Sequence, residues 1–211
     1  MGISYSNDDI NKYVENNEIK AKYKIEYYED INQKVAELLS QRNIVARATG
    51  KNEWGARSLG NRAILGHPSF MESFYTINDL IKASDFWMPF APSILDEDAE
   101  NYLENFVEEK SYPYSMITAY DTSKNGIEKI RAGIHQGDHS CRPQVVTQKR
   151  NEQYYDLLKK FKALTGIGGV VNTSLNIHGY PLAANLEQVF FTFENSGLEY
   201  MAIENYLVSK R

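Results

Sequence analysis

The sequence predicts an α/β fold in which helices flank a sheet. Strand-like segments alternate with helical segments along the chain, and such alternation is typical of helices packed on the faces of a sheet. The apolar residues of the helical segments recur every three or four positions, as they do on one face of a helix. The chain has 211 residues, of which 42% are hydrophobic, and this is enough for one core. We therefore expect a single domain over residues 1–211.

The first half of the chain carries five predicted elements. The pattern predicts a helix over residues 6–16, a strand over 22–28, a helix over 30–40, a strand over 43–48 and a helix over 69–82. Ser6 and Asp9 have the spacing of a capping box, which marks the start of the first helix. Ile31, Val35 and Leu39 share one face of the second helix.

The second half continues the alternation. In order, we expect a helix in the acidic run 96–109, a strand over 114–120, a loop over 133–143, a helix over 151–166, a strand over 168–174, a helix over 185–197, and strands over 198–203 and 205–210. The acidic run is interpreted as a solvated helix face. Gly166 stands where a helix C-cap is expected, and an apolar run follows it, which indicates a buried strand.

Composition excludes several classes of protein. The single cysteine, Cys141, cannot form an internal disulfide, and the start of the chain lacks the pattern of a secretory signal, so we expect a cytoplasmic protein. No apolar run is long enough to span a membrane, for which about 18 residues are needed. The net charge of −5 argues against a nucleic-acid partner.

Residues 49–62, TGKNEWGARSLGNR, place three glycines around Arg57 and Arg62, directly after a predicted strand. Glycine lets a ligand approach the backbone, and the planar fork of arginine matches the oxygens of a phosphate or carboxylate. Ligands of α/β folds commonly bind beyond strand ends. In residues 41–62, five basic residues accompany a single acid, Glu53. The segment is a candidate site for a small anion, and the alternative is a Gly-rich turn with surface arginines.

In residues 135–146, HQGDHSCRPQVV, the spacing resembles that of a His-x-x-acid-His metal motif. The residues with this spacing are His135, Asp138 and His139. That motif requires both histidines on one helical face, and the neighbouring glycines and proline argue against a helix. We therefore expect hydrogen-bonding histidines and no metal site. Arg142 is a better candidate for binding an anion, because the proline after it restricts its backbone to extended conformations.

Residues 170–181, VVNTSLNIHGYP, carry an apolar strand that ends in Asn172, Thr173, Ser174 and Asn176. Amides and hydroxyls at the carboxyl end of a strand can donate to phosphate or carbonyl oxygens. The alternative is a capped turn. The sequence identifies no arrangement of histidine and acid around Ser174, so we do not propose a serine nucleophile.

Four motifs, in order along the chain, resemble the carboxyl-terminal domain of the nodulation-type and antibiotic-type O-carbamoyltransferases. The family pattern G-R-M-E-F/W-G-P-R-A-L-G-N-R is similar to residues 50–62, and K-x-R-E-x-F/W-R-P-F-A-P-S is similar to residues 82–93. The pattern N-T-S-F-N-x-x-G-x-P is similar to residues 172–181. The family's His, Asp, Thr-or-Ser, Arg and Gln motif corresponds to His135, Asp138, Ser140, Arg142 and Gln144. The resemblance extends from about residue 2 to the end of the chain.

The resemblance implies a YrdC-like α/β fold, a twisted sheet with flanking helices. It also implies that this domain converts carbamoyl phosphate and ATP, with Mg²⁺ expected beside ATP, to carbamoyladenylate. A separate Kae1-like amino-terminal domain, in cis or in trans, would transfer the carbamoyl group to a hydroxyl acceptor and would hold the iron. The implied catalytic residues are Lys82, Arg142 and Ser174. The residues implied to bind substrate or nucleotide are Arg57, Arg62, His135, Asn172, Thr173 and Asn176.

The sequence departs from the family pattern at several positions. In the first motif the substitutions are Lys51, Asn52, Ala56 and Ser58. Ser84 and Met88 stand where the family often has arginines, Tyr180 where a glutamate is common, and Ala56 where a proline is usual. Loss of two cations favours an alternative, a non-catalytic nucleotide-binding, anion-binding or regulatory module of the same fold. A threonylcarbamoyladenylate synthase is less well supported, because the Lys-Arg-rich start of that family is not evident.

Overall fold

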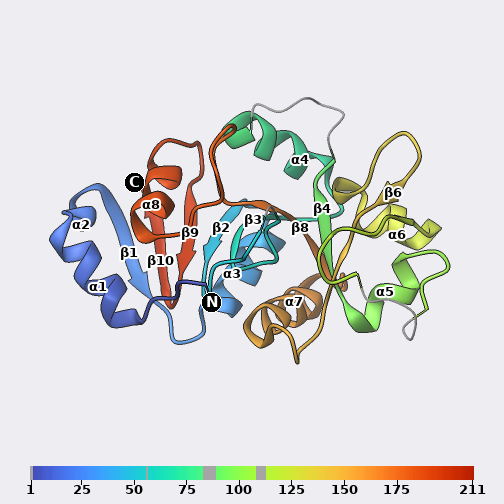
Figure 1. The fold of residues 1–211 in the computed structure, drawn as a ribbon, viewed down its shortest axis with the longest axis horizontal. Helices are drawn as coiled ribbons and strands as arrows, with labels where there is room; N and C mark the ends of the chain where they lie inside the picture. Colours follow the sequence, from blue (N-terminus) through green and yellow to red (C-terminus); the bar gives the residue numbers. More distant parts are fainter. Residues whose placement is uncertain (1, 56, 83–88, 108–112) are drawn as a thin grey trace.

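The computed structural model describes the chain except residues 1, 56, 83–88 and 108–112 and the side chains of Leu80 and Lys82. The described strands form an eight-stranded mixed sheet in the order β1-β10-β9-β2-β3-β8-β4-β7 (Figure 1). The pairs β2 with β9 and β4 with β7 are parallel, and the other neighbours are antiparallel. The strands are β1 (Tyr23–Tyr27), β2 (Val45–Ala48), β3 (Arg62–Gly66), β4 (Ala91–Leu95), β7 (Gln144–Val146), β8 (Gly169–Ser174), β9 (Tyr200–Ile203) and β10 (Tyr206–Lys210).

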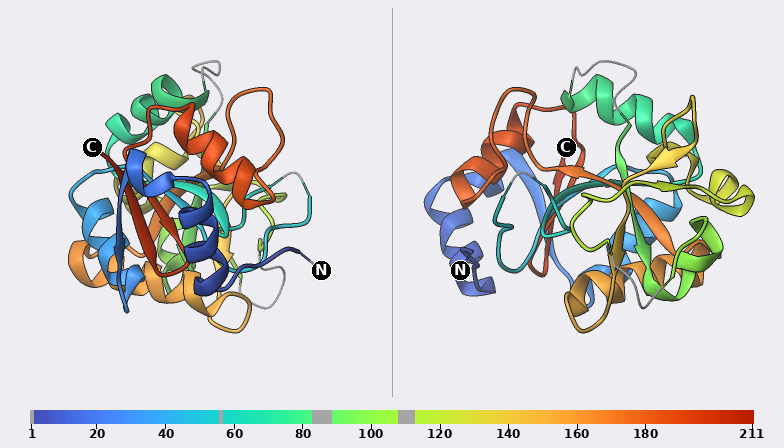
Figure 2. Two further views of the ribbon diagram at one scale, coloured as in Figure 1. Left: turned by 90° about the vertical axis from the view of Figure 1, so that its left-hand side faces the viewer. Right: turned by 45° about the vertical axis from the view of Figure 1, so that its right-hand side comes forward.

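Helices lie on both faces of this sheet (Figure 2). The helices α3 (Ile31–Ser40) and α7 (Glu152–Thr165) pack against each other on one face. On the other face lie α1 (Asn7–Asn16), α4 (Met71–Ile77) and α8 (Leu186–Glu194). Shorter elements are α2 (Ile19–Lys22), a π turn (Asn78–Lys82), α5 (Asp96–Tyr102), β5 (Tyr120–Asp121), α6 (Lys124–Lys129), a 3-10 turn (Arg131–Gly133) and β6 (Ser140–Cys141). In the part of the chain that the structure describes, no helix is long and apolar enough to cross a membrane.

The central strands are apolar on both faces because each face is covered by helices. Successive side chains of a strand point to opposite faces, so neighbouring residues belong to different cores. In β3, Ile64 packs with α1, α4 and α8, whereas Leu65 packs with α3 and α7. In β8, Val171 belongs to the same core as Ile64, and Val170 belongs to the same core as Leu65. The predicted class, a mixed α/β fold with flanking helices, is confirmed by this arrangement.

Local sequence patterns predicted the start of α1 and the end of α7 correctly. The Ser6 side chain accepts from the Asp9 backbone, and the Asp9 carboxylate accepts from the Ser6 backbone, so α1 begins with the predicted capping box. Helix α7 ends at Gly166, whose φ of +74° is left-handed. Glycine adopts this conformation without the steric cost that a Cβ brings.

Other predictions were wrong. The strand expected over 114–120 is an irregular segment that reaches β5 only at its end, because Met116 has a φ of +55° and leaves the extended conformation. Strands β3, β4 and β7 were not predicted, and the predicted loop over 133–143 contains a short strand, β6. The helix expected over 69–82 is α4 followed by the π turn, and α5 ends at Tyr102.

Candidate active site

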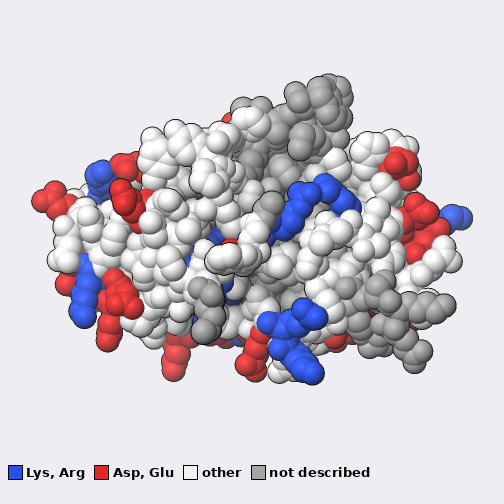
Figure 3. All heavy atoms as spheres, in the orientation of Figure 1, with Lys and Arg blue, Asp and Glu red and all other residues white. Residues whose placement is uncertain are grey.

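A pocket of about 480 Å³ lies where β8 ends and β4 begins. Ala91 pairs with Asn172 across these two strands, and the segment 135–142, which includes β6, forms a further wall. On the face drawn in Figure 3, acidic side chains lie mostly at the edges, whereas the middle is largely white and blue. The pocket is lined by Arg57, Ser58, Pro89, Phe90, Ala91, Met116, Ala119, His135, Asp138, Ser140, Cys141, Arg142, Asn172, Thr173, Ser174, Asn176, His178 and Gly179.

The pocket gathers most of the side chains that the sequence singled out. From the three motif segments come Arg57, His135, Arg142, Asn172, Thr173, Ser174 and Asn176. The side chain of Lys82 lies outside the described residues, as do Ser84, Met88 and Ala56. Sequence reasoning missed Phe90 and Ser58 as lining residues, although both lie inside motifs that the sequence shares with the family.

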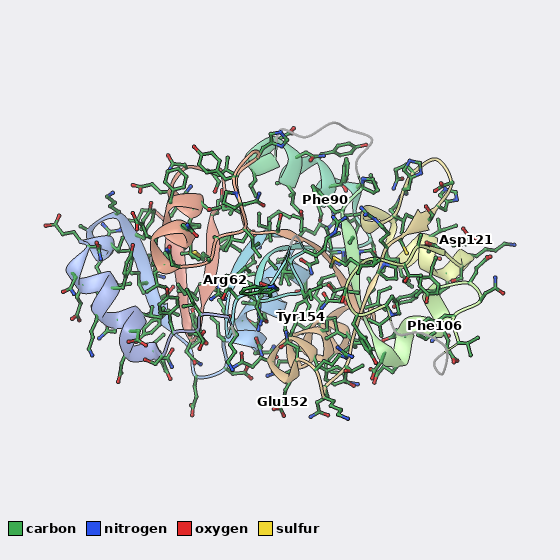
Figure 4. All side chains as sticks on the ribbon, viewed as in Figure 1. Arg62, Phe90, Phe106, Asp121, Glu152 and Tyr154 are labelled. Carbon is green, nitrogen blue, oxygen red and sulfur yellow. The ribbon has the colours of Figure 1, made fainter. Side chains whose placement is uncertain are left out.

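Arg62 does not line this pocket. Its side chain is 2% exposed, and its guanidinium donates to the backbone carbonyls of Thr49 and Gly50 at 3.3 and 3.2 Å. Burial lowers the pKa of Arg62, and the neighbouring charge of Glu53 opposes that shift. In Figure 4, Arg62 lies in the middle of the molecule, apart from Phe90 at the pocket. Arg62 therefore ties the two ends of the Gly-rich segment together in this structure.

Glu53 holds the Gly-rich segment in shape from within. Its carboxylate accepts hydrogen bonds from the backbone amides of Leu59, Asn61 and Arg62, at 2.8, 2.7 and 3.0 Å. Hydrogen bonds to a charged acceptor are stronger than neutral ones, so this side chain fixes the returning half of the segment. The segment thereby presents Arg57 to the pocket. The sequence feature that could have indicated this role is that Glu53 is the single acid in a basic stretch.

Arg47 and Tyr154 stabilise the Gly-rich segment from the core. An Arg47 guanidinium nitrogen donates to the carbonyl of Gly60, and the guanidinium lies 5.4 Å from the centre of the Tyr154 ring. Burial lowers the pKa of Arg47 to about 10, so the side chain remains charged at neutral pH. Both side chains are buried, and the conformation of the segment is thus tied to the core.

His135 and Asp138 form a pair at the rim of the pocket. His135 Nδ1 lies 2.9 Å from Asp138 Oδ1, and the backbone amide of Ser140 donates to the same oxygen at 2.9 Å. The pKa of Asp138 is lowered to about 2, first by the hydrogen bond from the Ser140 backbone amide and then by the Ser140 and His135 side chains. Asp138 is therefore an anion at neutral pH and orients the His135 ring.

A buried polar network from three strands adjoins the pocket through Asn172. Asn172 Nδ2 lies 3.0 Å from Ser93 Oγ and 3.2 Å from Gln144 Oε1, and Ser93 Oγ donates to Gln144 Oε1 at 2.9 Å. Gln144 Nε2 in turn donates to the carbonyl of Leu59 at 2.8 Å. The network joins β4, β7 and β8 to the Gly-rich segment, so it fixes the position of Asn172 at the pocket.

The end of β8 turns sharply beside the pocket. Ser174 Oγ donates to Asn176 Oδ1, and Asn176 Nδ2 donates to the carbonyl of Tyr180. Gly179 has a φ of +84°, which allows the turn. The arrangement holds hydroxyl and amide groups at the strand end.

Cys141 lines the pocket but is expected to be unreactive. Its side chain is buried, and burial raises the pKa of the thiol to about 11. Only the thiolate is nucleophilic, so alkylation of the native chain near pH 8 should be about a hundredfold slower than that of the urea-unfolded chain. Mass spectrometry after timed iodoacetamide treatment measures both rates. Equal rates would contradict the buried environment.

Known proteins resemble this chain in sequence. The sequence profile described as "Carbamoyltransferase C-terminus" matches residues 36–210. The nodulation protein NolO of Bradyrhizobium diazoefficiens is 29% identical over 187 residues, which cover 89% of this chain and 34% of that protein. A 3'-hydroxymethylcephem-O-carbamoyltransferase of Amycolatopsis lactamdurans is 30% identical over 160 residues, which cover 76% of this chain and 29% of that protein. The chain thus spans about a third of the length of the curated relatives it matches.

One solved structure shows the same fold. The crystal structure of HypF from T. kodakarensis aligns with a TM-score of 0.60 and 18% identity over 88% of this chain and 22% of that one. At this identity the likeness establishes the fold alone, and that fold is YrdC-like.

Proposed function

The chain belongs to the family of carbamoyltransferase C-terminal domains, and from this premise we propose that it activates a carbamoyl group. The proposed reaction forms carbamoyladenylate from carbamoyl phosphate and ATP. The observation that carries the proposal is one pocket in which Arg57 and Arg142, from separate segments, meet the polar end of β8. Adenylation brings several anionic groups together, and guanidinium groups offset their repulsion.

The proposed chemistry has two steps, and in each one bond forms as another breaks. Water splits carbamoyl phosphate into carbamate and inorganic phosphate, and a carbamate oxygen then attacks the α-phosphorus of ATP. The bond from that phosphorus to pyrophosphate breaks, so the products are carbamoyladenylate and pyrophosphate. In this proposal, Arg57 and Arg142 bind phosphate oxygens and stabilise charge at the transferring phosphorus. Ser174, Thr173 and Asn176 orient the bound groups at the strand end, and Lys82 is assigned to the phosphates on the resemblance alone.

Mg²⁺ is proposed to arrive with the nucleotide. Among the described residues, no three His, Cys, Asp or Glu side chains gather in a way that could hold a metal ion. The nucleotide phosphates would therefore supply the ligands, as magnesium is usually held by one or two protein groups and the substrate phosphates. The chain's own residues bind and orient the anions.

Transfer to a hydroxyl acceptor is proposed to need a second part. This chain spans about a third of its relatives, and we assign the acceptor step to a Kae1-like amino-terminal domain, in cis or in trans. The iron expected in the family is assigned to that domain as well. The acceptor would be chosen there and not in the pocket described above.

Pyrophosphate release tests the proposed function. We expect the purified chain with ATP and Mg²⁺ to release pyrophosphate only when carbamoyl phosphate is added. Inorganic phosphate in place of carbamoyl phosphate is the control. The alternative function, a non-catalytic anion-binding or regulatory module, predicts that carbamoyl phosphate or ATP binds without release of pyrophosphate. That result would contradict the catalytic function.

A further inference from the structure

The orientation of the Gln144 carboxamide is fixed by its neighbours. Its nitrogen donates to the carbonyl of Leu59 at 2.8 Å, and a carbonyl oxygen can only accept. Its oxygen is therefore the end that faces Ser93 and Asn172. The assignment of the two ends rests on the network, as it must for any carboxamide.

This orientation sets that of Asn172. The Asn172 nitrogen lies within 3.0 to 3.3 Å of three acceptors, Ser93 Oγ, Gln144 Oε1 and the carbonyl of Ser58. If the Asn172 carboxamide were reversed, its oxygen would face two carbonyl oxygens. Two acceptors cannot form a hydrogen bond with each other, so this orientation is unfavourable. The nitrogen of Asn172 thus donates into the buried network. The oxygen is the free end of the group.

Two polar atoms at this pocket lack a hydrogen-bond partner within the described part of the chain, namely Asn172 Oδ1, which can only accept, and Ser58 Oγ, which can accept as well as donate. Asn172 is 1% exposed and Ser58 is 3% exposed, and both residues line the pocket. A buried polar atom without a partner costs free energy, and a ligand that supplies a donor removes that cost. Asn172 Oδ1 therefore needs a donor from a ligand, and Ser58 Oγ can accept from the same donor group.

We propose that Asn172 Oδ1, assisted by Ser58 Oγ, recognises the amino group of the carbamoyl substrate. This inference rests on the proposed function and adds the atoms that select the substrate. The carbamoyl group carries two N–H bonds next to its carbonyl, and acetyl phosphate has a methyl group in the same position. A methyl group would leave both acceptors unpaired, so the pocket discriminates against acyl phosphates that lack the amino group.

Ser58 is the part of this pair that is particular to the chain, since the family motif has alanine at this position. Asn172 belongs to the motif itself and carries the main contact. Ser58 then adds a second acceptor for the second N–H. Its hydroxyl makes no hydrogen bond with the described residues, so its removal should affect ligand choice and not folding.

The test compares affinities for carbamoyl phosphate and acetyl phosphate by calorimetry with the whole chain. We expect the wild type to prefer carbamoyl phosphate by at least about tenfold, the effect of one hydrogen bond to a buried group. Ser58→Ala should lower this preference about threefold to tenfold without loss of resistance to urea. Asn172→Leu, which is similar in size and apolar, should abolish the preference. Ser73→Ala is the matched control, because Ser73 Oγ is also buried and has no partner among the residues that the structure describes, but it lies outside the pocket.

Equal affinity of the wild type for both phosphates would overturn the inference. So would an unchanged preference in Ser58→Ala, which decides the matter even if Asn172→Leu fails to fold. A chain that prefers carbamoyl phosphate but releases no pyrophosphate would support the recognition site and refute the adenylation step. Failure of the proposed recognition site and failure of the proposed adenylation step therefore give different results.

Discussion

Replacing Gly60 with alanine is expected to lower the free energy of unfolding by about 3 kcal/mol, the sum of overpacking and a disfavoured backbone conformation. A Cβ at this position would lie 2.3 Å from Tyr154 Cδ1, and Gly60 has a φ of +104°. Tyr154 cannot move aside because its side chain is wholly buried in the core beside α3. Urea denaturation followed by circular dichroism measures the loss.

Gly55→Ala is the matched control for this prediction. Gly55 also has a positive φ, +118°, but a Cβ there would meet no atom of the described residues within 4 Å, its chain neighbours aside. It should show only the backbone part of the cost, roughly 1 to 2 kcal/mol. An equal loss in both variants would contradict the packing of Gly60 on Tyr154.

Replacing Arg142 with alanine is expected to weaken carbamoyl phosphate binding by about 1.5 to 3 kcal/mol, the range for a hydrogen bond to a charged group. That corresponds to a loss of affinity of roughly tenfold to 150-fold. Arg142 lines the pocket and lies on a segment whose direction is set by the following proline. Calorimetry with carbamoyl phosphate measures the change, and Arg57→Ala should behave in the same way.

Arg131→Ala serves as the control for the arginine variants, because Arg131 is exposed and lies outside the pocket. It changes the net charge by the same amount but should leave the affinity unchanged. If Arg131→Ala and Arg142→Ala weakened binding equally, the effect would be one of overall charge and not of the pocket.

The sequence identified three segments that line the pocket but not where each of their side chains lies. Arg57 and Arg62 are five residues apart and look alike in a sequence, yet one lines the pocket and the other is buried. Their difference depends on Glu53 and on carbonyls that the folded segment brings together. Local spacing carries no information on such contacts.

The same limit explains the missed strands. β3 follows the Gly-rich segment with only a short apolar run, and β4 contains Pro92, which weakens a strand signal. Both become strands because β8 lies between them and pairs with each. In contrast, α1 and α7 carry their caps in their own sequence, at Ser6 and Gly166, and were found.

The most direct test of the central claim is to look for the adenylate itself. The purified chain would be incubated with ATP, Mg²⁺ and ¹³C-labelled carbamoyl phosphate, and the nucleotides would be analysed by mass spectrometry. The proposed function predicts a ¹³C-labelled carbamoyladenylate that forms with wild-type chain and is strongly reduced with Arg142→Ala. Unmodified ATP, with no labelled adenylate from a chain that binds carbamoyl phosphate, would contradict it.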